Sequence, residues 1–126
     1  MLFKSFEYIK DIERLINNSH SLPIFKGYKA IDKRGVEKLI DEIYATLPVD
    51  VQIARQYLRD NNQEIPETYE KSENVYNLLK MLEIYLDDGW LFINNVIVKT
   101  KEMNNLLKRL HDSLPEEIQK VQNMNK

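Results

Sequence analysis

The sequence predicts one helix-dominated α+β domain made of two pseudo-repeats, each in the order helix, β-hairpin, helix, helix. Apolar residues recur at helical spacing over much of the 126-residue chain. Two short segments of high β-propensity contain turn residues. One apolar series occurs twice, 67 positions apart. Since the chain is long enough to bury one core, a single domain over residues 1–126 is expected.

The repeat lies in residues 27–58 and recurs more weakly in residues 94–124. In both copies an apolar series leads to a Leu-Pro pair and then to a second helical pattern. This arrangement indicates an internal duplication, with repeat 1 at about residues 1–61, a polar linker at about 62–74 and repeat 2 at about 75–126. The matched series are Val36, Leu39, Ile40, Ile43 and Leu47, and Met103, Leu106, Leu107, Leu110 and Leu114.

Repeat 1 begins with an amphipathic helix, expected over residues 2–17, where apolar side chains form one stripe. Pro23 excludes a continuing helix, and Lys26-Gly27 separates two short β-prone segments. These residues predict a β-hairpin with its turn near Lys26-Gly27.

Two helices are expected after this hairpin. Asp32 can accept hydrogen bonds from the free amides of a first helical turn, so it is a suitable N-cap for a helix to about Ala45. Proline is tolerated in the first turn of a helix and not in its interior. Leu47-Pro48 is therefore expected to end that helix and begin another over residues 49–60, giving an antiparallel or angled pair.

Repeat 2 has the same order of elements. A helix over residues 73–88 is expected to end at Gly89, the residue best suited to a left-handed C-terminal cap. The apolar run 90–93 precedes Asn94-Asn95, and asparagine tolerates the positive φ angles of a two-residue hairpin turn. A second hairpin is therefore predicted here.

The last two helices carry their own start signals. Thr100 is expected to cap a helix over residues 101–112. Ser113 and Glu116 match the capping-box pattern, in which the serine accepts from a backbone amide and the glutamate reaches back. A final short helix is therefore expected after Pro115.

A further pattern in the first half of the chain consists of Leu22-Pro23-Ile24, Gly27, Ile31-Asp32, Leu39-Ile40-Asp41, Ile43, Leu47-Pro48 and Ala54. It resembles a short module of bacterial and cyanobacterial proteins described as DivIVA-like or ATP synthase subunit b-like. Tyr28 stands where that family often has lysine. The resemblance extends weakly to the second half through the repeat. It implies a non-enzymatic assembly protein, associated with cell division or membrane machinery, that self-associates and recruits partners.

No catalytic constellation is expected. Cysteine is absent, and the two histidines, His20 and His111, lie outside any metal-ligand spacing. Three glycines are too few for a phosphate-binding loop. The adjacent carboxylates Asp87-Asp88 are typical of a solvated helix surface. The sequence therefore predicts no enzyme activity, no cofactor and no metal site.

The composition favours a soluble protein without a charged polymeric partner. Eighteen basic and twenty acidic residues give a net charge of −2, which indicates neither nucleic acid nor anionic lipid. No apolar run has the length of a signal peptide or a membrane span. We expect a cytoplasmic location, or the organelle stroma if the gene is plastid-encoded.

Four hairpin aromatics, Phe25, Tyr28, Trp90 and Phe92, are the candidate partner surface. Their size favours a position over the core, and the alternative is an exposed surface that binds another protein. The expected function is a non-enzymatic protein–protein interaction adaptor or scaffold, either as a monomer or as a homo-oligomer. The alternative is a nucleic-acid-associated regulator that uses the helix pair around Leu47-Pro48.

Overall fold

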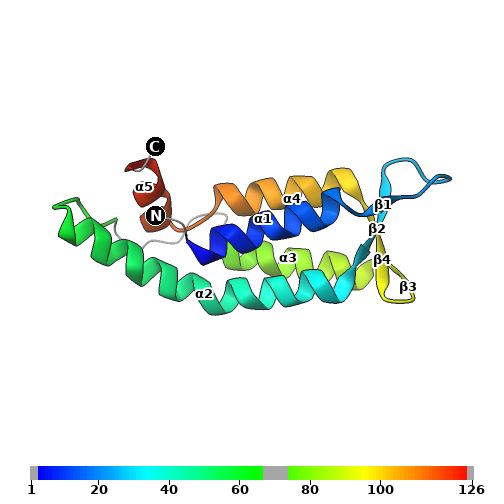
Figure 1. Ribbon diagram of the computed structural model, residues 1–126, viewed down its shortest axis with the longest axis horizontal. Coiled ribbons are helices and arrows are strands. Elements are labelled where there is room, and N and C mark those ends of the chain that lie inside the picture. Colours follow the sequence, from blue (N-terminus) through cyan, green and yellow to red (C-terminus); the bar gives the residue numbers. More distant parts are fainter. Residues whose placement is uncertain (1–2, 67–73, 125–126) are drawn as a thin grey trace.

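The computed structural model describes residues 3–66 and 74–124 and confirms a helix-dominated α+β fold (Figure 1). Leu2, at the start of the first predicted helix, and residues 67–73 of the predicted linker lie outside the described residues. The helices are α1 (Lys4–Asn17), α2 (Lys33–Asp60), α3 (Val75–Asp88), α4 (Thr100–Asp112) and α5 (Glu116–Met124). The strands are β1 (His20–Ser21), β2 (Tyr28–Asp32), β3 (Trp90–Phe92) and β4 (Asn95–Lys99).

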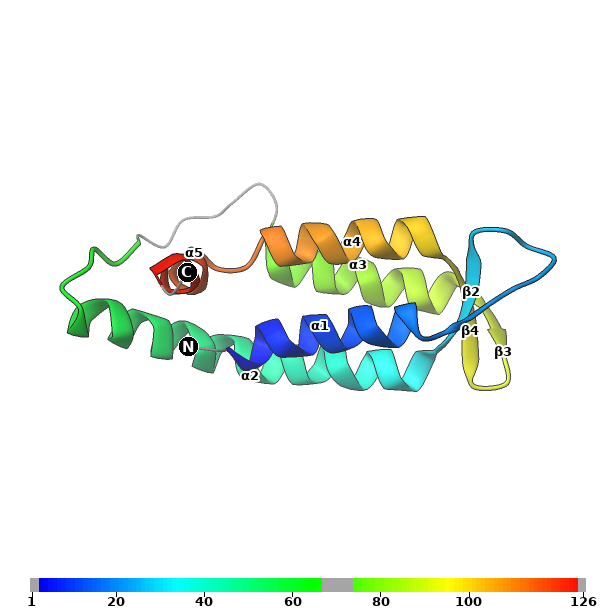
Figure 2. The same ribbon diagram turned by 45° about the horizontal axis from the view of Figure 1, so that its top comes forward.

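The molecule is elongated, with a small sheet at one end. Helices α1, the first half of α2, α3 and α4 lie side by side along the long axis (Figures 1 and 2). Helix α1 packs mainly on α2, and α3 packs mainly on α4. The second half of α2 extends past these helices and packs on α5 at the end remote from the sheet.

The core fills the space between these helices and the inner face of the sheet. Both repeated apolar series are interior, as their spacing predicts: Leu39 and Leu106 are partly buried, and the other members are fully buried. The two series do not pack chiefly on each other, because α2 meets α1 and α4 meets α3. Other fully buried core side chains include Ile9, Ile12, Ile16, Leu79, Leu82, Leu86 and Ile118.

The four strands form one antiparallel sheet in the order β1-β2-β4-β3, so the two hairpins are joined through β2 and β4. Two backbone hydrogen bonds extend this central ladder. Lys33 N donates to Asn94 O over 3.3 Å, and Thr100 N donates to Gly27 O over 2.8 Å. Adding 67 to the number of Lys33, the donor of the first bond, gives Thr100, the donor of the second. Subtracting 67 from the number of Asn94, the acceptor of the first bond, gives Gly27, the acceptor of the second. The offset of the repeat therefore exchanges the two bonds.

The expected break at Leu47-Pro48 is wrong. Helix α2 is 28 residues long and continues without a break through Pro48. Figure 1 shows that it bends along its length. Leu47, Ala54 and Leu58 lie fully buried on its inner side, so the apolar stripe continues past the proline. Burial of this stripe against α1 and α5 outweighs the roughly 3 kcal/mol that an interior proline costs. Repeat 1 thus has one long helix where two are expected.

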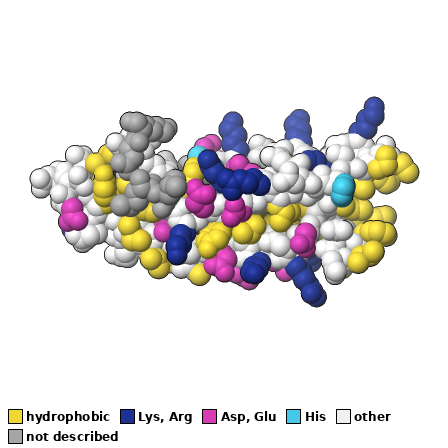
Figure 3. All heavy atoms as spheres, in the orientation of Figure 1, with side chains coloured by type: hydrophobic (Ala, Val, Ile, Leu, Met, Phe, Trp, Pro, Cys, Tyr) yellow, Lys and Arg dark blue, Asp and Glu magenta, His cyan; other side chains and the backbone are white. Residues whose placement is uncertain are grey.

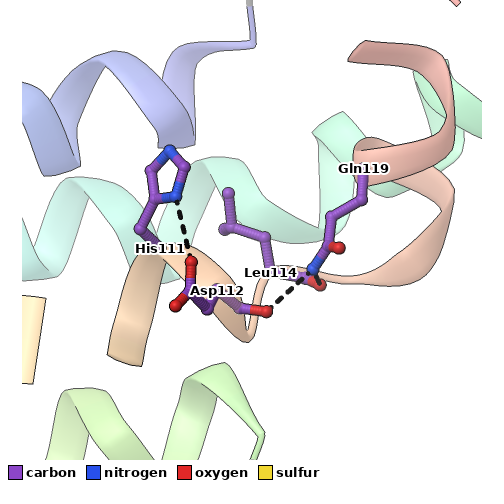
Figure 4. A network of polar contacts seen from close by, with 4 residues as sticks. All are labelled: His111, Asp112, Leu114 and Gln119. Atoms are coloured by element: carbon purple, nitrogen blue, oxygen red, sulfur yellow. Dashed lines mark hydrogen bonds and ion pairs between the residues drawn. The ribbon is translucent and has the colours of Figure 1, made fainter. Parts of the chain in front are cut away.

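Repeat 2 does break at the corresponding place. Helix α4 ends at Asp112 and α5 begins at Glu116. Figure 4 shows how Gln119 supports the turn: its Nε2 donates to the backbone oxygens of Asp112 (3.0 Å) and Leu114 (2.7 Å). These carbonyls lack helical partners where α4 ends, and the glutamine supplies one.

Several local expectations are corrected at the helix ends. Asp32 occupies the N-cap position of α2, but its side chain accepts no capping hydrogen bond. Lys99, not Thr100, is the N-cap residue of α4. Helix α3 begins at Val75, where the Asn74 side chain accepts a hydrogen bond from Asn77 N over 2.9 Å. The amide oxygen of Asn74 is therefore the observed cap.

Gly89 and the second hairpin turn also differ from expectation. Gly89 is extended, with φ −73° and ψ 159°, rather than left-handed. A Cβ at this position would lie 2.4 Å from Val96 Cγ2, so glycine is required by close packing on β4. The turn is Ile93-Asn94, one residue earlier than expected, because Phe92 pairs with Asn95. Ile93, not an asparagine, has the positive φ of 59°.

A buried carboxylate joins the far half of α2 to the start of α1. Asp50 Oδ2 accepts hydrogen bonds from the backbone amide of Ser5 (2.8 Å) and from its hydroxyl (2.6 Å). Both residues are almost fully buried. Because the first amides of a helix lack intrahelical partners, Asp50 acts as an N-terminal cap supplied by another helix.

Candidate docking surface at the sheet end

The sheet end of the molecule carries a concentration of exposed apolar side chains. Figure 3 shows hydrophobic atoms gathered at this end of the visible face. Trp90 is 81 % exposed and Ile93 is 78 % exposed. The exposed apolar side chains at this end are Ile24, Phe25, Trp90, Leu91, Phe92 and Ile93.

Of the four candidate aromatics, three lie on the surface. Phe25, Trp90 and Phe92 are 60 %, 81 % and 65 % exposed, and Tyr28 is half-buried. The expectation that Phe25, Trp90 and Phe92 cover the core is therefore wrong. Phe25 and Tyr28 contact each other edge to face, with ring centroids 6.3 Å apart.

The strand register explains why these aromatics miss the core. Val96 and Val98 of β4 are buried, so the face that they occupy looks into the helices. Trp90 lies opposite Ile97 and Phe92 lies opposite Asn95, which places both aromatic rings on the other face. Only one face of this terminal sheet has helices to cover it.

Strand β3 is apolar on both faces. Leu91 lies opposite Val96 and so shares the inner face, yet it is 64 % exposed because β3 is the edge strand. Ile24, Leu91 and Ile93 were missed as site residues by the sequence reasoning. The signal for Leu91 and Ile93 is the uninterrupted apolar run of residues 90–93 next to a turn, since a half-buried strand alternates.

A shallow groove of about 360 Å³ lies beside β3, where the sheet meets α3 and α4. It is lined by Tyr28, Tyr85, Asp88, Gly89, Trp90, Ile97, Lys99 and Glu102. The hydroxyl of Tyr85 accepts a hydrogen bond from Lys99 N over 3.1 Å. Burial, aided by a hydrogen bond to Glu102, raises the pKa of Tyr85 to about 12. The groove thus combines aromatic walls with charges of both signs at its rim.

The sheet is basic although the chain is acidic. Residues 20–32 and 90–99 contain Lys26, Lys29 and Lys99 against one carboxylate, Asp32, a net charge of +2. The whole chain has −2, so the remaining residues carry −4. Lys29 Nζ donates to Ile16 O over 3.0 Å, at the end of α1, where a cation is favourable.

The other polar groups considered from the sequence do not come together. His20 lies on β1, whereas His111 contacts Phe6 in a tilted arrangement, with ring centroids 5.0 Å apart. Asp87 pairs with Lys33, with Oδ1 and Nζ 3.1 Å apart. Over residues 3–66 and 74–124, no group of three or more histidine, aspartate or glutamate side chains could hold a metal ion.

No helix within the described part of the chain is both long and apolar enough to span a bilayer. Comparison with protein-family models, with curated proteins and with solved structures found no match for this chain. The case for a function therefore rests on the surface of the molecule and on the sequence resemblance.

Proposed function

We propose that this protein is a non-enzymatic adaptor or scaffold that binds a protein partner through its sheet end. The observation that carries the proposal is the exposure of six apolar side chains at that end. Large contiguous apolar patches on soluble domains mark interaction sites. The contact residues proposed are Phe25, Tyr28, Trp90 and Phe92, joined by Ile24, Leu91 and Ile93.

The scaffold behind this surface supports a binding role. The inner face of the sheet is held by Ile31, Val96 and Val98, all buried in the core. The docking residues on β3, together with Tyr28 on β2, are thus presented by strands of the sheet. Large aromatic side chains presented in this way contribute most of the energy of typical protein interfaces. The resemblance to DivIVA-like modules supports a place in cell-division or membrane-associated assemblies.

The test is capture of the partner from an extract of cells that make the protein naturally. The double variant Trp90→Ser/Phe92→Ser removes two exposed rings, so it should leave the melting temperature almost unchanged. We expect a discrete protein to be retained in near-stoichiometric amount by the wild type. The double variant should retain about tenfold less or lower.

Ile84→Ser is the matched control, because Ile84 is an exposed apolar residue on α3 that belongs neither to the sheet nor to the lining of the groove. It should retain the partner as the wild type does. If all three proteins capture the same material, or none captures any, the proposal is wrong.

The nucleic-acid alternative loses its structural basis. It depends on a helix pair around Leu47-Pro48, and α2 passes through these residues as a single helix.

A further inference from the structure

The groove beside β3 is acidic, although the sheet that it adjoins is basic. Two carboxylates, those of Asp88 and Glu102, line it together with one ammonium, that of Lys99, so its lining has a net charge of −1. The positive charge of the sheet lies towards its other edge. Lys26 belongs to the turn of the first hairpin, and Lys29 is bound at the end of α1. The groove therefore favours a cation.

Asp88 ends helix α3 without a compensating positive charge. The C-terminal end of a helix favours cations, and α1, α2 and α4 each have an arginine in the last turn. The last turn of α3 has no basic residue and ends in Asp87-Asp88. Asp87 pairs with Lys33, whereas the carboxylate of Asp88 makes no hydrogen bond or ion pair with another described residue. Its position disfavours the helix, which points to a ligand outside the fold.

The internal repeat provides a comparison for this groove. Strand β1 pairs with β2 as β3 pairs with β4, so each groove position has an equivalent in repeat 1, at an offset of 70 before the hairpins close and of 67 after. None of four such equivalents is a carboxylate, a tyrosine or a tryptophan. Because repeat 1 forms the same corner without these side chains, the fold does not require them. The equivalents of Tyr85, Asp88, Trp90 and Glu102 are, in that order, Leu15, Asn18, His20 and Gly35.

We propose that this groove binds a basic side chain of the protein partner, and an arginine in particular. The inference rests on the proposed adaptor function and names the chemistry of its partner. Three aromatic side chains, Tyr28, Tyr85 and Trp90, line the groove. A guanidinium group stacks on aromatic rings and donates paired hydrogen bonds to a carboxylate. The arginine lies against Trp90, and Asp88 and Glu102 accept its hydrogen bonds.

The openness of the groove favours a side chain over a free small molecule. Sites for small molecules bury about 70 to 90 % of the ligand surface. Trp90 is 81 % exposed, and Asp88 and Glu102 are exposed as well, so the groove cannot enclose a ligand to that extent. A side chain that arrives with a partner needs no enclosure, because the partner also covers the apolar side chains next to Trp90.

Charge favours a different protein over a second copy or a lipid surface. A hollow between α2 and α3 adjoins the groove at the end of α3 and is lined by Glu37, Asp41, Glu83 and Asp87. A second copy that met this surface symmetrically would bring like charges together. A phosphatidylcholine headgroup carries a phosphate beside each ammonium, so it gains little from a negative groove. A basic segment of another protein has neither disadvantage.

The test uses purified protein and two matched peptides. The probe is acetyl-Leu-Arg-Leu-amide, and its control has citrulline, which has the shape of arginine but no charge, in the central position. Trp90 is the one tryptophan of the chain and lines the groove, so its fluorescence reports binding. We expect a saturable change of emission with the arginine peptide. The citrulline peptide should bind about fivefold more weakly, and the difference should shrink at high salt.

Four variants separate recognition of charge from an effect on folding. Asp88→Asn and Glu102→Gln should each weaken binding of the arginine peptide about threefold and leave the citrulline peptide unaffected. Lys99→Gln removes a like charge and should strengthen it. Asp60→Asn is the matched control, because Asp60 ends α2 as Asp88 ends α3, remote from the sheet. Both asparagine variants should raise the melting temperature by about 1 to 3 °C, but only Asp88→Asn should weaken binding.

Three outcomes would overturn the proposal. They are equal binding of the arginine and citrulline peptides, a dimer in sedimentation that Asp88→Asn abolishes, and a change of Trp90 emission with phosphatidylcholine vesicles but none with peptide. If the partner captured from the extract depends on Trp90 and Phe92 but not on Asp88 and Glu102, this inference fails and the adaptor function stands. Binding of the arginine peptide that needs both carboxylates, with no partner captured, would support the groove and refute the adaptor function.

Discussion

Ala30 lies directly opposite Ile97 in the β2–β4 ladder, and the two residues are 67 positions apart, the same separation as in the apolar repeat. Every other pair of the ladder is symmetric about this one: Lys29 faces Val98 and Ile31 faces Val96. An approximate two-fold axis therefore passes between Ala30 and Ile97. One internal duplication accounts for both the sequence offset and this symmetry.

The first prediction concerns the buried stripe of α2. Ile40 is fully buried among the helices, so Ile40→Ala should lower the free energy of unfolding by about 2 to 5 kcal/mol. The loss comes from removed apolar contacts and from the cavity that remains. Thermal or urea unfolding measures it, and the melting temperature should fall at every protein concentration. A variant of unchanged stability that lost self-association would show that this stripe is an interface and not the core.

The second prediction concerns the cap that Asp50 provides for α1. Asp50→Ala leaves the buried Ser5 amide without an acceptor, and we expect a loss of about 1 to 3 kcal/mol in unfolding free energy. Asp50→Asn retains an acceptor but loses the charge at the helix N-terminus, so its loss should be smaller. Asp41→Asn, on the same helix and exposed, is the control. Equal stability of all three variants in urea unfolding would contradict the cap.

The third prediction concerns the contact of Gly89 with β4. Gly89→Ala places a Cβ 2.4 Å from Val96 Cγ2 and 3.1 Å from Ile97 O, so packing must shift, at a cost of about 1 to 3 kcal/mol. Val96→Ala removes the nearer methyl group. In a double-mutant cycle, Gly89→Ala should therefore cost less in the Val96→Ala background than in the wild type. If the effects of the two substitutions are strictly additive, contact with Val96 is not the reason that residue 89 must be glycine.

The fourth prediction follows from the raised pKa of Tyr85. Its pKa is about 12 in the folded protein and about 10 in the unfolded chain, so the folded state holds this proton more tightly. The resulting stabilisation is complete below pH 10 and is lost as the pH rises from 10 to 12. Tyr85→Phe should reduce this loss relative to the wild type, measured by urea unfolding across that range. If the unfolding free energy falls with pH at the same slope in both proteins, the prediction is refuted. Comparing the two proteins cancels the contributions of the other tyrosines and of the lysines, which titrate in the same range.

Much of the fold could be predicted because it depends on local periodicity. The stripes of α1 and α3, and both hairpins, are visible in the spacing of apolar and turn residues. The pattern at Pro48 is misleading because the effect of the proline depends on a neighbour: α5 packs on the second half of α2 and favours the continuous helix. The Ser5–Asp50 cap, 45 positions apart, has no local signal.

The site was only partly predictable for a similar reason. Alternation identifies which residues share a face of a strand, but it does not say which face is covered. Size alone favours a core position for Trp90 and Phe92, whereas the sheet lies at the end of the molecule, where helices cover one side.

The central β2–β4 ladder also has a consequence for assembly. In a single copy of the repeat, β2 or β4 would be left with an open edge of five residues, and two such copies could close it only by meeting in solution. Carrying both copies on one chain makes that meeting intramolecular. The junction then forms at any dilution, whereas a dimer of separate halves would come apart as the protein is diluted.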